Sequence, residues 1–166
     1  NGVAAYGTIM YVNFIFIAIF LGYSIGSAPI ISFHYGAKNS SELKNLFKKS
    51  LSLIGSWGIM LFVIAQLIAG PLAKLFVGYN ADLFLITKHG FQIFCFAFLI
   101  NGFNIFGSSF FTALNNGLIS AAISFLRTLV FQLSVVLILP MILGINGIWI
   151  SVAIAELLTL CVTVTC

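Results

Sequence analysis

Charged residues are scarce in this 166-residue sequence. They make up 6% of the chain, as seven Lys or Arg and three Asp or Glu, while 61% of the residues are hydrophobic. The mean hydropathy is +1.19. Soluble domains carry about 25% charged residues. So few charges cannot cover a surface that faces water, which excludes an ordinary soluble domain and indicates that lipid surrounds most of the chain.

Groups for catalysis or metal binding are also few. The three cysteines lack the spacing of a disulfide framework or a metal site, and there are two histidines. The acidic residues, Glu42, Asp82 and Glu156, lie far apart in the sequence. Neither a phosphate-binding glycine loop nor a His-Glu-x-x-His motif occurs. We therefore expect no enzyme and no cofactor. There is also no basic stripe with interleaved aromatic residues, so we expect no nucleic acid partner.

Long apolar runs dominate what is present. A membrane-spanning helix needs about 20 mostly apolar residues. Runs of this kind occupy residues 3–32, 51–69, 81–114, 118–143 and 148–166. Backbone groups in lipid must be satisfied internally, and the alternation of strands is absent. The sequence therefore predicts an all-α membrane protein, a polytopic bundle of five transmembrane helices.

The connectors predict how these helices lie in the membrane. The connector 34–50 holds most of the lysines, so the positive-inside rule makes it a cytoplasmic loop and places residue 1 outside. Asn39 followed by Glu42 resembles a capping box, which predicts a helix start within this connector. Gly70 and Pro71 predict the end of the second span, followed by a short interfacial helix.

Polar residues inside the spans are the candidates for function, because each costs free energy in lipid. Glu156 and Arg127 lie about ten residues into their spans, where a charge costs roughly 2.5–3.5 kcal/mol. Asn13, Asn101 and Asn104 lie in other spans. Such residues also act as structural contacts between helices, worth about 0.6 kcal/mol each. The sequence leaves both interpretations open, and also whether Glu156 pairs with Arg127.

One stretch of the chain resembles a known family. GSAPIISFHYGAKN, residues 26–39, resembles a helix end and the following cytoplasmic loop of the multidrug and toxic compound extrusion (MATE) family. Residues 3–7, 108–114, 123–127 and 146–149 resemble parts of other spans. By this resemblance the chain is a partial C-terminal lobe of a MATE-type transporter, a six-helix lobe without its first helix. Its start without Met also leads us to expect a piece of a longer chain.

The resemblance implies a function. MATE transporters carry out secondary active multidrug efflux across the cell membrane, exchanging Na⁺ or H⁺ for organic, often cationic, compounds. The partners would be these small molecules, the lipid bilayer and the missing N-terminal lobe of the same chain. The substrate-cavity candidates are Asn13, Asn101, Asn104, Gln132 and Phe103, and the ion-coupling or charge-bearing candidates are Glu156 and Arg127. Some members carry an acidic residue near the position of Asn104, where this chain has none.

Two alternatives remain. A lipid-linked oligosaccharide flippase of a related branch would need more cations in its cavity, whereas Arg127 is the one cation in the middle of a span. A membrane scaffold that transports nothing would direct its polar stripes towards neighbouring helices rather than towards water.

Overall fold

The computed structural model describes residues 2–166, with side chains from residue 5 onwards. Its elements are α1 (Gly2–Gly36), α2 (Ser40–Val77), α3 (Ala81–Phe94), the 3₁₀ turn η1 (Cys95–Ala97), α4 (Phe98–Ala113), α5 (Gly117–Phe125), the π-helical segment η2 (Leu126–Gln132), α6 (Leu133–Leu143) and α7 (Ile145–Thr165). The five continuous helical segments, α1, α2, α3–α4, α5–α6 and α7, are long and apolar enough to cross a membrane. This confirms the predicted all-α polytopic bundle.

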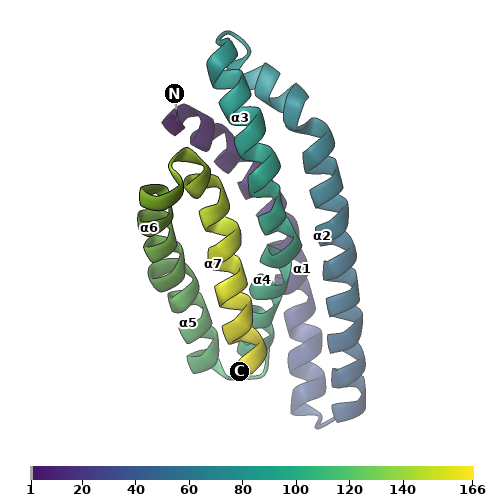
Figure 1. Cartoon of the computed structure of the whole chain (residues 1–166). Helices are drawn as coiled ribbons and strands as arrows, with labels where there is room; N and C mark the ends of the chain where they lie inside the picture. Colours follow the sequence, from purple (N-terminus) through teal and green to yellow (C-terminus); the bar gives the residue numbers. More distant parts are fainter. Residues whose placement is uncertain (1) are drawn as a thin grey trace.

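The α3–α4 segment occupies the middle of the bundle, where it contacts α1, α2 and α7. The α5–α6 segment packs along the far side of α7 (Figure 1). The α1–α2 connector, the α4–α5 turn and the C-terminus lie at one end of the bundle, and the α2–α3 and α6–α7 turns lie at the other (Figure 1). Successive spans therefore alternate in direction, as the loop pattern predicts.

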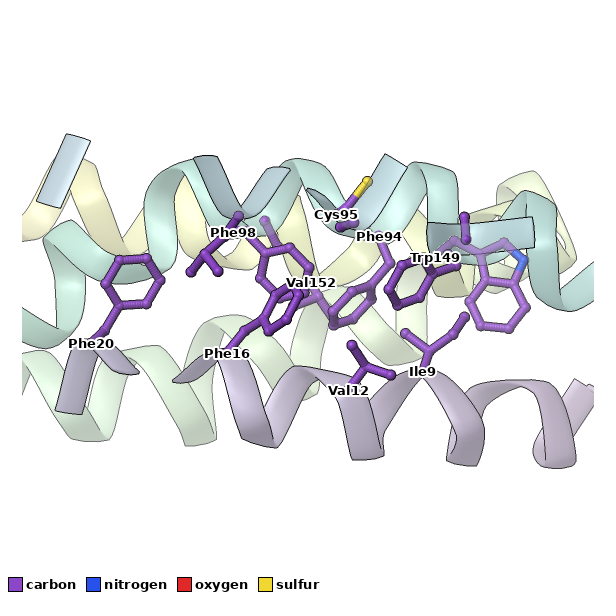
Figure 2. Packing of buried hydrophobic residues seen from close by; sticks show 14 of the residues in the cluster. Ile9, Val12, Phe16, Phe20, Phe94, Cys95, Phe98, Trp149 and Val152 are labelled. Atoms are coloured by element: carbon purple, nitrogen blue, oxygen red, sulfur yellow. The ribbon is translucent and has the colours of Figure 1, made fainter. Parts of the chain in front are cut away.

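Aromatic side chains fill the space between α1, α3–α4 and α7 (Figure 2). Phe16 of α1 packs on Phe98 with ring centroids 4.8 Å apart, and Phe98 meets Phe94 edge-on at 5.8 Å. Trp149 of α7 is fully buried beside Gly90, where a Cβ atom would lie only 2.6 Å from the indole ring. The missing side chain at Gly90 thus lets α3 and α7 approach closely around the largest residue of the core.

The connector predicted over residues 34–50 is non-helical only between Gly36 and Ser40, and α2 begins where the sequence predicts a helix start. Helix α1 continues to Gly36 and α2 begins at Ser40. The Asn39 side chain accepts a hydrogen bond from the backbone N–H of Glu42 at 3.2 Å, so the predicted cap sets the start of α2. The long basic connector is in fact a short turn followed by helix.

The predicted end of the second span at residue 69 is also wrong, since α2 runs through Pro71 without a break. Proline removes one helical hydrogen bond and kinks a helix. Figure 1 shows α2 bending towards α3 in its last turns. Burial at every fourth residue holds the helix against its neighbours on both sides of the proline: Ala65, Ala69, Ala73 and Val77. Packing therefore outweighs the local stop signal.

Two irregular segments interrupt the third and fourth spans, and the sequence gives no sign of either. The 3₁₀ turn η1 separates α3 from α4, and the π-helical segment η2 separates α5 from α6.

The last span begins at Ile145 rather than at residue 148, because Gly144 alone makes the turn with φ of 60°.

Candidate functional site

A buried ion pair joins the fourth and fifth spans. Arg127 lies in η2 and Glu156 lies midway along α7. Nη2 of Arg127 is 2.7 Å from Oε1 of Glu156, and the two side chains are 22% and 5% exposed. Nε of Arg127 donates to the same oxygen at 2.9 Å. Each charge is costly in a membrane, and the pairing offsets that cost for both.

Two asparagines of α4 complete the contacts of this pair. Nδ2 of Asn104 donates to Oε2 of Glu156 at 2.7 Å and to the backbone carbonyl of Glu156 at 2.8 Å. Oδ1 of Asn101 accepts a hydrogen bond from Nη2 of Arg127 at 2.7 Å. Because residues three apart lie on one helix face, α4 holds one amide against each member of the ion pair.

The network extends along α7 to Thr163, two helical turns beyond Glu156. The Thr163 hydroxyl has one hydrogen, which it donates either to Oδ1 of Asn104 at 3.4 Å or to the backbone carbonyl of Thr159 at 2.9 Å. Gly107 of α4 makes this approach possible, because a Cβ atom there would collide with the Thr163 methyl group. Thr163 follows Glu156 at a spacing that keeps both residues on the same helix face.

Arg127 lies near the start of the π-helical segment η2. A π-helical segment forms hydrogen bonds across five residues instead of four, and such segments occur frequently at functional sites. The wider turn changes the direction of every side chain that follows it relative to an ideal α-helix.

Gln132 at the end of η2 makes no hydrogen bond to the network around the ion pair. The structure therefore does not bring this predicted cavity residue to the ion pair.

Asn13 lies outside the network as well. It is buried on α1, and its Nδ2 is 4.0 Å from the Met10 sulfur. Its Oδ1 finds no hydrogen-bond partner within the described part of the chain. The predicted candidates Asn101, Asn104, Arg127 and Glu156 thus come together, whereas Asn13 and Gln132 stay apart from them.

An apolar cavity of about 600 Å³ adjoins the network. Its wall is rich in phenylalanine and combines α2, α4 and α7: Phe47, Leu51, Phe103, Phe106, Gly107, Phe110, Phe111, Leu160, Thr163, Val164 and Cys166. The candidate Phe103 contributes to this wall, and Thr163 belongs to both the wall and the polar network. Thr163 thus lies between the apolar cavity and Asn104, and Asn104 in turn contacts the buried Glu156 carboxylate.

Both oxygens of the Glu156 carboxylate are engaged, Oε1 by Arg127 and Oε2 by Asn104. A cation that binds Oε1 would displace Arg127, whereas Oε2 accepts one hydrogen bond and keeps a free lone pair. The network also contains Oδ1 of Asn101, Oδ1 of Asn104 and the hydroxyl of Thr163. Amide and hydroxyl oxygens of this kind are ligands for hard cations.

A separate cluster of hydroxyl groups joins α4 to α5 near the turn between them. Oγ of Ser108 lies 2.9 Å from Oγ of Ser120 and 3.1 Å from Oγ of Ser124. Thr112 donates to Ser120 at 2.7 Å. These contacts are of the kind that hold helices together in lipid.

A bundle of long apolar helices with ionisable residues near the middle of the helices is an architecture that secondary transporters use. A family model described as MatE matches residues 1–138, so the chain belongs to the MatE family. No curated protein matches it.

Solved structures of MATE transporters share the fold. The Vibrio cholerae MATE transporter VcmN in its bent form superimposes with a TM-score of 0.90 at 20% identity, over 98% of this chain and 37% of that one. A MATE in complex with MaL6 gives 0.86 at 21% identity, over 96% and 36%. An inward-facing multidrug resistance MATE family transporter of the MOP superfamily gives 0.84 at 19% identity, over 96% and 36%. The chain thus spans little more than a third of the length of these transporters.

Proposed function

We propose that this chain is part of the C-terminal lobe of a cation-coupled exporter in the cell membrane, which exchanges Na⁺ or H⁺ for organic, often cationic, compounds. The observation that carries this proposal is the link between the two parts of the site. Thr163 belongs both to the polar network around Glu156 and to the wall of the apolar cavity. A change at the carboxylate can therefore alter the cavity, as coupled transport requires.

The cavity supports binding of the apolar part of a substrate. Its volume of about 600 Å³ lies within the range of about 300–1,000 Å³ that is typical of small-molecule sites. Phe103, Phe106 and Phe111 offer ring faces and edges on its wall. Such surfaces hold flat apolar groups and attract organic cations through the ring quadrupole.

The ion pair supports coupling by competition. Protonation of Glu156 would remove the charge that holds Arg127, and Na⁺ near Oε1 would replace the guanidinium directly. Either event releases Arg127 from α7 and weakens the contact between the fourth and fifth spans. In the full transporter, we propose that this release accompanies the movement of this lobe against the N-terminal lobe.

A flippase for lipid-linked oligosaccharides receives less support. Such a substrate carries a pyrophosphate and calls for unpaired cations in the cavity. Arg127 is already paired with Glu156, and the cavity wall contains no Lys or Arg among the described residues.

The test is Glu156→Gln in the full-length transporter. We expect drug efflux and drug resistance to fall while the amount of protein in the membrane is unchanged. Glu42→Gln is the matched control, because Glu42 is an exposed acid at the start of α2 and lies outside the network. Unchanged resistance in Glu156→Gln would remove Glu156 from the mechanism.

A labelling experiment separates a transporter from a scaffold. The exposed Cys161 and Cys166 are first replaced by serine, and Phe111→Cys then places a thiol in the cavity wall. We expect a water-soluble maleimide to modify this thiol, and transported compounds to slow the modification. Modification at the same rate with and without such compounds would favour the scaffold.

A further inference from the structure

A small groove at the α1–α2 end of the bundle combines an apolar floor with two lysines. The groove has a volume of about 240 Å³ and lies between the start of α2 and the end of α4. Its wall consists of Leu43, Lys44, Phe47, Lys48, Phe110 and Leu114. The rings of Phe47 and Phe110 meet with centroids 4.8 Å apart and close its inner side.

The two lysines sit one helical turn apart on the same face of α2, about 6 Å along the axis. Both are exposed. The Arg127–Glu156 pair is the single salt bridge among residues 2–166, so neither lysine has a carboxylate partner there. Glu42, the acidic residue of this region, instead accepts a hydrogen bond from Asn45 at 3.4 Å.

The surroundings of the groove carry a strong positive charge. Residues 34–50 contain four lysines and one glutamate, which gives a local net charge of +3 (4 − 1). Topology alone accounts for lysines at this end of the bundle. It does not account for Lys44 and Lys48 flanking an apolar groove, whereas Lys38 and Lys49 do not line it.

We propose that this groove binds an anionic phospholipid, with the headgroup phosphate on Lys44 and Lys48 and one acyl chain against the apolar floor. The lysines precede the apolar part of α2, which places them at the depth of the headgroups. Basic pockets between membrane helices on the cytoplasmic side bind anionic headgroups for this reason. The proposal depends on the membrane fold and not on the transport mechanism.

The test uses the intact transporter in detergent, titrated with phosphatidylglycerol and with phosphatidylcholine of the same acyl chains. Native mass spectrometry counts the lipids that remain bound. We expect the wild type to bind phosphatidylglycerol more tightly than phosphatidylcholine. In the double variant Lys44→Gln/Lys48→Gln, the affinity for phosphatidylglycerol should fall about fivefold for each lysine removed.

The matched control is Lys38→Gln/Lys49→Gln, which removes the same charge from the same end of the bundle without touching the groove. Its affinity for phosphatidylglycerol should change much less. An equal loss in both double variants would show a diffuse basic surface and would overturn the proposal. Equal wild-type affinity for the two lipids would do the same.

Two further arms separate the lipid from a free anion. Leu114→Trp fills the groove and keeps both lysines, so it should weaken phosphatidylglycerol binding through the acyl chain alone. Inorganic phosphate should not displace the lipid at matched concentration. Displacement by phosphate, or unchanged lipid binding in a folded Leu114→Trp variant, would contradict a site for a phospholipid.

Discussion

Arg127 places Nε and Nη2 on a single oxygen of Glu156, at 2.9 and 2.7 Å. This arrangement leaves the other carboxylate oxygen for Asn104 at 2.7 Å. The carboxylate is therefore shared between a cation from the fourth span and an amide from the third. The Glu156 side chain of α7 therefore links the third, fourth and fifth spans to one another.

The two members of the ion pair should differ in their effect on stability. Arg127→Gln leaves a carboxylate that is 5% exposed without its cation, and breaking a buried pair in this way costs about 3–5 kcal/mol. Glu156→Gln leaves a guanidinium that is 22% exposed and keeps its hydrogen bond to Asn101, so the loss should be smaller. Thermal unfolding of the detergent-purified transporter measures both.

The double variant Arg127→Gln/Glu156→Gln is the control for that comparison. Because it buries no unpaired charge, it should be more stable than Arg127→Gln alone. If the double variant were as unstable as the sum of the two single variants, the contact between Arg127 and Glu156 would not be energetically coupled.

Asn104→Asp should be less stable than Asn104→Ala, although aspartate has nearly the same shape as asparagine. The new carboxylate would stand where Nδ2 now donates to Glu156 Oε2 at 2.7 Å, so two negative charges would meet in a buried place. Alanine removes the donor and adds no charge. Unfolding temperatures of the two variants give the order, and a more stable Asn104→Asp would contradict the expected repulsion between the two carboxylates.

Gly90→Ala should destabilise the bundle by about 1–3 kcal/mol, because a methyl group there overlaps the buried indole of Trp149. Gly26→Ala is the matched control. It is also a helical glycine, but a methyl group added there would meet no atom within 4 Å. At that position alanine should be neutral or stabilising by up to about 1 kcal/mol. Equal effects of the two substitutions would mean that α3 and α7 have room for a methyl group between them.

The orientation in the membrane can be tested from the two ends of the bundle. After replacement of Cys161 and Cys166, a thiol at Lys38→Cys should react with an impermeant maleimide only from the cytoplasmic side. A thiol at Tyr79→Cys, in the exposed α2–α3 turn at the opposite end, should react only from outside. Intact cells and inverted vesicles provide the two conditions, and the reverse pattern would invert the topology.

The fold class could be predicted from hydropathy because the bilayer leaves few alternatives to helices. The individual polar candidates could also be found, since Glu156 and Arg127 each stand out in an apolar run. Their contact could not be derived, because it depends on the phase of two helices. The segment η2 changes that phase around Arg127. Treating both spans as ideal α-helices therefore identifies Arg127 and Glu156 as candidates but does not predict the direction in which their side chains point.

At the end of α2, a local sequence signal predicts a helix end that the structure does not have. Gly70 and Pro71 form a strong local stop signal, but the buried alanines on either side outweigh it. A single sequence shows the local preference and not the neighbouring helix that competes with it. The polarity of Asn13 predicts a hydrogen-bond partner, but the described part of the chain provides none for its Oδ1.

The order of Arg127 and Glu156 along the chain has a consequence for biogenesis. Ribosomes deliver the span with Arg127 to the translocon before the span with Glu156. Before α7 is inserted, the Arg127 guanidinium has no carboxylate partner. Asn101, which is synthesised before Arg127, can already accept its hydrogen bond. Synthesis that stops before residue 156 would leave Arg127 without its carboxylate partner in the bilayer, at a cost of roughly 2.5–3.5 kcal/mol.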